Sequence, residues 1–260
     1  MSRSQGVEFD RFLKAVLPPM GLDWRRHRRR QVRRRVAERL RVLHFRSLDE
    51  YRLALAENPT EASFFRTLLG VTITRFYRDP EMWEFLGREI LPVLAGFPRV
   101  VMFSAGCAGG EEPYTLAMVW QEHGPPSVRP VILAMDMDET VLRRARAGVY
   151  EEGGLRLLPD HFRDTYFTRD GRLFRINPGV GAMVSFYLGD LSAIGPPRGI
   201  HLAFCRNLAY TYFSREIQAR ITEDFSRAVP PGGWMVIGAK EKTDLTPWFE
   251  VQHPCVYRRI

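Results

Sequence analysis

Apolar residues change their spacing near residue 100, and this change divides the chain into two parts. Before it they recur every three or four positions, which is the spacing of one face of an α-helix. Ser47 with Glu50 three residues later is typical of a helix N-terminus, and Asp79 before Pro80 is expected to cap another helix. The helices expected in this part cover residues 9–17, 32–43, 47–57, 61–69 and 80–94.

After residue 100, short apolar runs alternate with amphipathic segments. Strands are expected at residues 100–103, 131–135, 184–187, 202–205 and 234–237. Helices at 112–122, 139–147 and 215–229 separate most of these strands, which predicts a parallel sheet covered by helices. Residues 151–182 break the rhythm, and an Asp170-Gly171 turn between apolar flanks predicts a small antiparallel excursion there.

A glycine-rich turn joins the first strand to the helix that follows it. Residues 104–110 read S-A-G-C-A-G-G, and Glu111, Glu112 and Pro113 come next. Glycine lets a ligand approach the backbone, whereas a dinucleotide site would show G-x-G-x-x-G and offer helix N–H groups to a pyrophosphate. Two carboxylates at the helix entrance would repel a phosphate, so a cationic ligand without phosphate fits better. S-adenosylmethionine, with its ammonium and sulfonium groups, is such a ligand.

Composition limits the classes of protein to which the chain can belong. Its 260 residues are 45% apolar, enough for one large domain, alone or with a small companion. No apolar run approaches the roughly 18 residues of a membrane span, and the N-terminus lacks the apolar core of a signal peptide. No membrane insertion and a cytoplasmic location are therefore expected. Three dispersed cysteines and six scattered histidines fit neither a disulfide framework nor a metal site.

The net charge of +8 comes from one segment. Ten arginines and a single acid, Glu38, lie between Arg25 and Arg41, so this segment carries +9 and the remainder about −1. Like charges four residues apart on a helix repel each other, and docking on an acidic helical protein is the favoured interpretation. A solvated helix face is one alternative; nucleic-acid binding is another, but the run lacks interleaved aromatic residues beyond Trp24 and Phe45. The candidate docking residues are Arg29, Arg30, Arg33 and Arg34.

Several blocks, in order along almost the whole chain, resemble those of the CheR-type protein-glutamate O-methyltransferases, which methylate chemotaxis receptors. The blocks are T-I-T-R-F-Y-R-D at 72–79, S-A-G-C-A-G-G-E-E-P-Y at 104–114, D-M-D at 136–138, A-R-A-G-V-Y at 145–150, F-C-R-N at 204–207, Y-F at 212–213, P-G-G at 231–233, and Gly238 with Glu241. The resemblance implies an α/β fold: a class I methyltransferase Rossmann-like sheet, an N-terminal all-α domain and a small inserted β-subdomain. The implied bounds are 1–70 for the substrate-docking helical domain, 71–260 for the S-adenosylmethionine-dependent methyltransferase domain, and 151–182 for the insertion.

The resemblance also implies which residues bind S-adenosylmethionine and its product, S-adenosyl-L-homocysteine. Asp136 ends the second strand, where a carboxylate can accept the ribose hydroxyls, and Arg78 has the fork geometry that holds a carboxylate. The alternatives are a helix N-cap for Asp136 and a structural salt bridge for Arg78. The implied cofactor-binding residues are Thr72, Thr74, Arg78, Gly106, Glu112, Asp136, Asp190, Leu191, Arg206 and Asn207, and the implied catalytic residues are Arg78 and Tyr212.

Three departures separate the chain from the usual pattern of the family. Five residues, where the family has four, lead from Asn207 to the tyrosine of the Tyr-Phe pair. Tyr212 keeps its Phe213 neighbour and is the expected active-site tyrosine, Tyr210 is its rival, and core packing is the alternative for either. Residues 238–242 read G-A-K-E-K in place of G-H-S-E, and His201 stands where an aspartate commonly precedes the fourth strand. These departures bear on which substrate the chain methylates more than on which cofactor it binds.

A glutamate acceptor fits a site that has an arginine and a tyrosine and no evident general base. Its carboxylate, with a pKa of about 4.3, is ionised at neutral pH, so the enzyme has mainly to align and desolvate the reactants. The expected activity is S-adenosylmethionine-dependent formation of glutamate methyl esters on a chemoreceptor-like protein. The alternatives are a CheR-like methyltransferase acting on a small molecule or RNA, and a non-catalytic S-adenosylmethionine-binding module.

Overall fold

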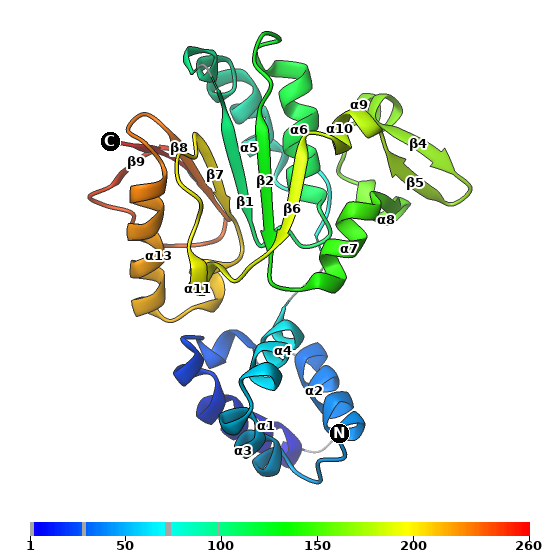
Figure 1. The fold of residues 1–260 in the computed structure, drawn as a ribbon, viewed down its shortest axis with the longest axis vertical. Helices are drawn as coiled ribbons and strands as arrows, with labels where there is room; N and C mark the ends of the chain where they lie inside the picture. The colour runs from blue at the N-terminus through cyan, green and yellow to red at the C-terminus, as the bar shows by residue number, and fades with distance from the viewer. Residues whose placement is uncertain (1–2, 28–29, 71–73, 98) are drawn as a thin grey trace. The chain divides into compact units, whose positions relative to one another are not determined.

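The computed structural model describes residues 3–27, 30–70, 74–97 and 99–260, and it divides the chain into two compact units (Figure 1). The first, called the helical unit, comprises Met1–Val71 together with Thr211–Ala219. The second, called the sheet unit, comprises Thr72–Tyr210 and Arg220–Ile260. The chain therefore leaves the sheet unit for a short segment after Tyr210 and then returns to it.

The helical unit consists of α-helices and short 3₁₀ turns, as the apolar spacing predicts. In chain order these are α1 (Arg3–Val16), η1 (Pro18–Met20), η2 (Trp24–His27), α2 (Arg30–Val42), α3 (Leu48–Glu57) and α4 (Pro59–Leu69). The predicted start of α3 is confirmed, because the Ser47 side chain accepts a hydrogen bond from the Glu50 N–H at 3.1 Å. Asn58 begins α4 in the same way, by accepting from the Glu61 N–H at 3.0 Å.

A buried cluster of polar side chains joins three of these helices. The Tyr51 hydroxyl of α3 donates to Glu61 Oε1 of α4 at 2.6 Å. Arg39 of α2 donates from Nε to the same oxygen at 2.9 Å, and its Nη2 lies 2.5 Å from the other carboxylate oxygen. The charge of Glu61 is thus neutralised inside the unit, and α2 is held with Arg39 turned inward.

A seven-stranded sheet in the order β6-β2-β1-β7-β8-β10-β9 forms the centre of the sheet unit. Its strands are β1 (Val101–Ala105), β2 (Val131–Asp136), β6 (Val184–Leu188), β7 (Leu202–Cys205), β8 (Trp234–Ile237), β9 (Phe249–His253) and β10 (Val256–Arg259). The five strands from β6 to β8 pair in parallel, which confirms the predicted parallel sheet. The antiparallel edge of β10 and β9 was not predicted, because β9 buries only Phe249 and so lacks an apolar run.

Helices connect the parallel strands, and three of them match the predicted ones: α6 (Glu111–His123), α7 (Glu139–Ala147) and α13 (Arg215–Ala228). Two short helices, α11 (Leu191–Ile194) and α12 (Ala209–Tyr212), were not predicted. The helix expected at 80–94 is instead three shorter pieces: α5 (Pro80–Phe85), the π-turn η3 (Leu86–Ile90) and the 3₁₀ turn η4 (Pro92–Gly96). Pro92 cannot donate a backbone hydrogen bond, so a regular helix cannot continue through it.

The insertion between β2 and β6 contains the predicted antiparallel excursion. Strands β4 (Phe167–Asp170) and β5 (Leu173–Ile176) pair antiparallel, and β3 (Val149–Glu151) adds a third strand on the other side of β5. The short helices α8 (Glu152–Leu155), α9 (Asp160–Tyr166) and α10 (Pro178–Gly181) complete the segment. Figure 1 shows the β4–β5 hairpin projecting beyond α9, separate from the seven-stranded sheet.

Two absences hold for the part of the chain that the structure describes. No helix there is long and apolar enough to cross a membrane. No group of three or more histidine, cysteine or acidic side chains is gathered there as metal ligands would be.

Candidate cofactor site

Four adjacent parallel strands bring many of the predicted cofactor-binding residues to one edge of the sheet. Gly106 follows β1, Asp136 ends β2, Asp190 follows β6 and Arg206 follows β7. These strands are neighbours in the order β6-β2-β1-β7, with their carboxyl ends at the same edge. Ligands of open α/β sheets bind at this edge. Residues from 106 to 206 in sequence therefore converge on one candidate site.

The glycine-rich turn after β1 is left-handed at both of its ends. Gly106 has φ +71° and Gly110 has φ +90°. The N–H groups of Gly106 and Cys107 both donate to the Met135 carbonyl, at 2.8 and 3.0 Å, which joins the turn to β2. A Cβ on Gly110 would lie 3.0 Å from the Cβ of Ala145. Conformation and space both require glycine at position 110.

Glu112, in the first turn of α6, has both carboxylate oxygens engaged. Ser104 on β1 donates from Oγ to Oε1 at 2.8 Å, and Arg206 donates from Nη1 to Oε2 at 3.1 Å. Burial raises the pKa of Glu112, and the charge of Arg206 offsets this only in part. A second positive charge on a ligand would therefore be favoured beside this carboxylate.

Arg206 is the centre of a buried cluster, with a side chain that is only 4% exposed. Besides Glu112, it donates from Nη2 to the carbonyl of Arg78 at 3.1 Å and to the carboxylate of Asp79. Asp79 is the N-cap residue of α5, as predicted, but its side chain makes no capping bond because it is turned toward Arg206. Arg206 thus links the segment that carries Arg78 to the helix that carries Glu112.

Asp136 is fixed by two backbone donors. Its Oδ2 accepts from the Ala108 N–H at 2.9 Å and its Oδ1 from the Asp138 N–H at 3.0 Å. Burial raises the pKa of Asp136, and these hydrogen bonds act in the opposite direction. The helix N-cap of α7 is Asp138, which accepts from the Thr140 N–H at 2.8 Å, so the capping alternative for Asp136 does not hold. Each oxygen of Asp136 can accept one more hydrogen bond, as from a pair of hydroxyls.

Backbone strain is concentrated in the same region. Among the described residues, five that are not glycine have positive φ, and four of them are Tyr77, Asp79, Ala108 and Asn207. These residues lie in the loop of Arg78, in the glycine-rich turn and directly after Arg206. A left-handed conformation is costly for a residue other than glycine, least so for Asp and Asn, and it persists where surrounding contacts impose it, often at functional sites. The strain supports the assignment of this edge as a binding site.

The residues of this edge fit the predicted cofactor. Glu112 and Asp136 supply desolvated carboxylates for cationic and hydroxyl groups. The family comparisons identify the same chemistry. A family model described as the CheR methyltransferase SAM-binding domain matches residues 72–256, and one described as the CheR methyltransferase all-alpha domain matches residues 7–69.

The chain belongs to the CheR methyltransferase family. It is an S-adenosylmethionine-dependent methyltransferase, as predicted, and S-adenosylmethionine is its cofactor. The predicted fold, an all-α domain followed by a Rossmann-like methyltransferase sheet, is also confirmed.

Named relatives extend over most of the chain. The chemotaxis protein methyltransferase of Listeria monocytogenes is 28% identical over 89% of this chain and 88% of its own length. The chemotaxis protein methyltransferase of Borreliella burgdorferi is 26% identical over 97% of this chain and 94% of its own. The probable biofilm formation methyltransferase WspC of Pseudomonas aeruginosa is 31% identical over 91% of this chain but only 57% of its own length.

Arg78 of this CheR-family chain is exposed. Within the described residues, no carboxylate lies at ion-pair distance from its guanidinium, so the alternative of a structural salt bridge is not observed. Its charge nevertheless acts to lower the pKa of Glu112, so the two groups interact electrostatically. Its carbonyl accepts from Trp83 Nε1 at 2.9 Å and from Arg206 at 3.1 Å. The backbone of Arg78 is anchored while its charge remains at the surface.

Glu241 has a role in this CheR-family site that sequence reasoning missed. Its Oε2 accepts from the Asn207 N–H at 2.9 Å and from the Gly238 N–H at 2.7 Å, and so joins the ends of β7 and β8. The signal was present, since Glu241 follows Gly238 at a spacing of three. A Cβ on Gly238 would lie 2.6 Å from Asn207 Nδ2, which accounts for glycine there.

The other predicted cofactor residues differ in how far the structure engages them. Asp190 begins α11, and its Oδ1 accepts from the Ser192 N–H at 2.9 Å and from its hydroxyl at 2.7 Å. Leu191 is buried and Thr74 is half-buried. Thr72 lies outside the described residues.

The two candidate tyrosines are now distinguished by their surroundings. Tyr210 is 5% exposed, and its hydroxyl lies 3.1 Å from Thr222 Oγ1 of α13. Tyr210 is therefore accounted for by core packing. Tyr212 is half-buried and belongs to the helical unit. It stays the candidate active-site tyrosine.

The predicted docking arginines lie on α2, apart from Arg29, which is outside the described residues. Arg30 and Arg34 are exposed, and Arg33 is half-buried. With Arg46 and apolar side chains of the helical unit, they line a groove of about 500 Å³. One acid, Glu8, also lines the groove, so its charged lining residues are four arginines and one glutamate.

His201, one of the departures from the family pattern, has a structural role. Its Nδ1 accepts from the Val101 N–H at 3.1 Å, and its ring packs on Phe97 with centroids 4.3 Å apart. It ties the start of β7 to the start of β1. Its position at this end of the strands is opposite to the carboxyl edge of the cofactor residues.

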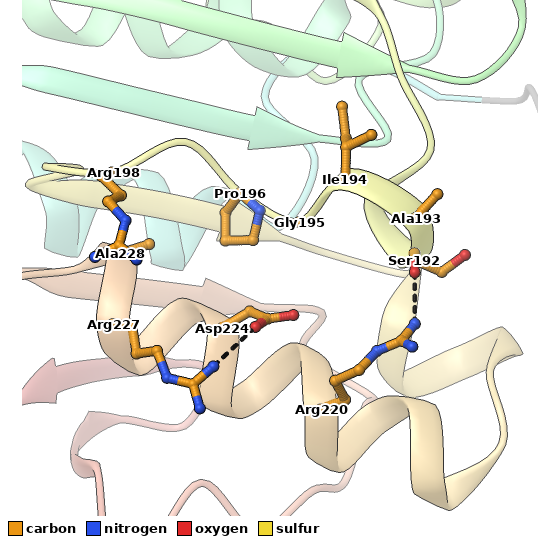
Figure 2. Close-up of a pocket in the computed structure, with 10 residues that line it drawn as sticks. All are labelled: Ser192, Ala193, Ile194, Gly195, Pro196, Arg198, Arg220, Asp224, Arg227 and Ala228. Atoms are coloured by element: carbon orange, nitrogen blue, oxygen red, sulfur yellow. Dashed lines mark hydrogen bonds and ion pairs between the residues drawn. The ribbon is translucent and has the colours of Figure 1, made fainter.

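A second hollow of about 380 Å³ lies between the α11 segment and α13 (Figure 2). Its lining shares no residue with the predicted cofactor set. Figure 2 shows Arg220 directed to the Ser192 carbonyl and Arg227 directed to Asp224. Arg227 Nη1 lies 3.4 Å from Asp224 Oδ1. Its charged lining residues are three arginines and a single acid, Asp224, so the hollow lacks the cation-binding character of Glu112 and Asp136.

Proposed function

We propose that this CheR-family methyltransferase forms methyl esters on glutamate side chains of an acidic helical protein, such as the cytoplasmic domain of a chemoreceptor. The observation that carries the proposal is the exposed guanidinium of Arg78, beside the cofactor residues and without a carboxylate partner among the described residues. A guanidinium binds a carboxylate through two parallel hydrogen bonds. The relatives named as chemotaxis protein methyltransferases support the same class of substrate, and such a substrate would place the reaction in the cytoplasm.

The chemistry asks for orientation rather than for proton transfer. Bound S-adenosylmethionine supplies a methyl group on a sulfonium sulfur, which keeps the bonding electrons when the methyl leaves. A glutamate with a pKa of about 4.3 is already ionised at neutral pH, so the chain need not supply a base. In this proposal Arg78 holds the acceptor carboxylate and the Tyr212 hydroxyl donates to it. Glu112 and Asp136 hold the cofactor, and alignment of the bound groups provides most of the acceleration.

The basic groove of the helical unit is the proposed docking surface. Its lining combines four arginines (Arg30, Arg33, Arg34 and Arg46) with apolar side chains and one acid, Glu8. An amphipathic helix with acidic residues beside an apolar stripe would match both features. Changing Arg30, Arg33 and Arg34 together to Glu should raise the substrate KM and reduce its salt dependence, while cofactor affinity stays unchanged. An unchanged KM and salt response would show that these arginines are only solvated.

The test of the acceptor uses the lability of methyl esters. The chain is incubated with methyl-labelled S-adenosylmethionine and a cell lysate, and the products are separated on a gel. The label should appear in a protein band and should be released as methanol by mild alkali, whereas methyl groups on nitrogen stay attached. Label in RNA, in a small molecule or in an alkali-stable protein linkage would refute the proposal. Cofactor binding without any labelled product would point to a non-catalytic module.

A further inference from the structure

Backbone hydrogen bonds fasten the returning segment Thr211–Ala219 to the loop that follows α1. The Asp23 N–H donates to the carbonyl of Tyr212 at 2.9 Å. The Ser214 N–H donates to the carbonyl of Gly21 at 2.8 Å. The backbone on both sides of residue 213 is therefore held by one short stretch of the helical unit.

Side chains reinforce the same attachment. The two backbone hydrogen bonds close an antiparallel β-bridge between Leu22 and Phe213, and the side chains of both residues are buried, at 6% exposed each. The His27 ring, which is 3% exposed as a residue, packs on the Tyr212 ring with centroids 5.2 Å apart and planes inclined by 31°. The ring of Tyr212 thus has a buried neighbour that limits its orientation.

Gly21 shows how closely the two stretches approach. Its φ of +72° is in the left-handed region, and a Cβ there would lie 2.7 Å from Cγ1 of Ile217. A larger residue at position 21 would have to displace Ile217 and with it the returning segment. The loop 21–27 therefore contacts the segment through backbone, aliphatic and aromatic groups together.

We propose that loop 21–27 is a positioning element for methyl transfer, which fixes Tyr212 to the unit that carries the docking arginines and orients its side chain through His27. This rests on the proposed function, because it takes Tyr212 as the tyrosine that contacts the acceptor. His27 is a positioning residue, since it acts through the Tyr212 ring. A tyrosine and a docking surface on one compact unit keep a fixed relation to each other, so a substrate bound to the arginines also meets a defined tyrosine.

The physical effect is loss of rotational freedom before the substrate binds. A half-buried tyrosine without a ring neighbour samples several side-chain orientations, and only one can place its hydroxyl on the acceptor. Misplacement of a positioning group lowers kcat without changing ground-state affinity for the cofactor. The expected signature is therefore a change in kcat that depends on the presence of the Tyr212 hydroxyl.

The experiment is a double-mutant cycle on the full chain. H27A should lower kcat about tenfold, with cofactor affinity and substrate KM within twofold of the wild type. Y212F should also lower kcat, and H27A should add little in the Y212F background, because the hydroxyl that His27 orients is already absent. H27F keeps an aromatic neighbour and should restore most of the activity. L55A, at a 5% exposed position of α3, is the matched control for general loosening of the helical unit and should leave kcat unchanged.

Several results would overturn the inference. One is that H27A and Y212F lower kcat independently, so that their effects multiply. Another is that H27F is as impaired as H27A, since a ring would then not be the feature that matters. If H27A does not fold, G21A perturbs the same segment from the other side and should give the same pattern of low kcat with normal cofactor binding; normal kcat in G21A would contradict the inference. If Y212F itself keeps full activity, the proposed role of Tyr212 fails, whereas a slow Y212F with a normal H27A defeats only the role of His27.

Discussion

Each unit contains a glutamate that is largely shielded from solvent and bound by an arginine, with a side chain 9% exposed in Glu61 and 13% exposed in Glu112. The two clusters differ in how completely the carboxylate is compensated. In the helical unit, Glu61 receives hydrogen bonds from Tyr51 at 2.6 Å and from Arg39 at 2.9 Å. In the sheet unit, the hydrogen bond from Arg206 to Glu112 is longer, at 3.1 Å. Arg206 also divides its donors between Glu112 and the loop of residues 78–79.

The pKa values of the two glutamates move in opposite directions as a result. Burial acts to raise the pKa of Glu61, but hydrogen bonds from Arg39 and Tyr51 outweigh it and the pKa is lowered. At Glu112 burial dominates, and the pKa is raised in spite of Arg206. A carboxylate that its own protein satisfies stabilises a fold, whereas one left undercompensated is typical of a ligand site. The same pair of residue types thus serves two purposes, and the balance of desolvation distinguishes them.

The two clusters should differ most in the free energy of unfolding that is lost when the arginine of each is removed. R206M leaves Glu112 in a desolvated position without its cation, and should destabilise the chain by about 3–5 kcal/mol. R39M removes a guanidinium whose side chain is 23% exposed, and Tyr51 still donates to Glu61, so the expected loss is about 1–3 kcal/mol. Urea denaturation at pH 7 measures both. Equal losses would show that the two clusters are energetically alike.

The backbone of the sheet unit could be predicted from the sequence because its signals are local. Apolar runs gave the five parallel strands, and the glycine spacing with Glu111 and Glu112 gave the turn and its preference for a cationic ligand. The predicted turn at Asp170-Gly171 joins β4 to β5. Each of these features depends on residues within a few positions of one another.

Features that depend on distant partners could not be predicted. Asp79 has the sequence of a helix cap, but Arg206, far along the chain, takes its carboxylate. The cluster of Tyr51, Glu61 and Arg39 joins three helices, and no spacing in the sequence marks it. For such residues, a buried ion pair outweighs the conformation or hydrogen bond that the neighbouring sequence favours. The partner in that ion pair is identified only in the folded chain.

Glu111, beside Glu112, should make the stability of the sheet unit depend on pH. Its side chain is 6% exposed, with Arg144 Nη2 at 3.5 Å, and burial raises its pKa to about 7 from an ordinary value of 4.5. The folded state then binds the proton more tightly than the unfolded state, so the stability due to this group is complete below about pH 4.5 and is lost as pH rises to about 7. E111Q cannot ionise and avoids this loss. Its free energy of unfolding, relative to the wild type, should rise by about 3 kcal/mol across that window.

E61Q is the control for this pH effect, because its stability relative to the wild type should change with pH in the opposite direction. Glu61 has a lowered pKa, so it contributes stability above its unfolded pKa and loses it as pH falls. E61Q should therefore become less stable relative to the wild type as pH rises. Urea titrations of both variants at several pH values test the pair. A difference between E111Q and the wild type that does not change with pH would show that Glu111 is ionised normally.

Neutralising Glu112 or Glu61 and measuring cofactor affinity tests most directly whether the two glutamates have different functions. E112Q removes the desolvated negative charge at the cofactor edge and should weaken binding of S-adenosyl-L-homocysteine by about 2 kcal/mol, or roughly 30-fold. E61Q should leave that affinity unchanged and should instead lower the free energy of unfolding by about 1–3 kcal/mol, because Arg39 and Tyr51 lose their charged acceptor. Isothermal titration calorimetry and urea denaturation of the two variants give the four values. If E112Q lost only stability and kept its affinity for S-adenosyl-L-homocysteine, Glu112 would be a structural carboxylate like Glu61. Its incompletely compensated charge would then have no role in cofactor binding.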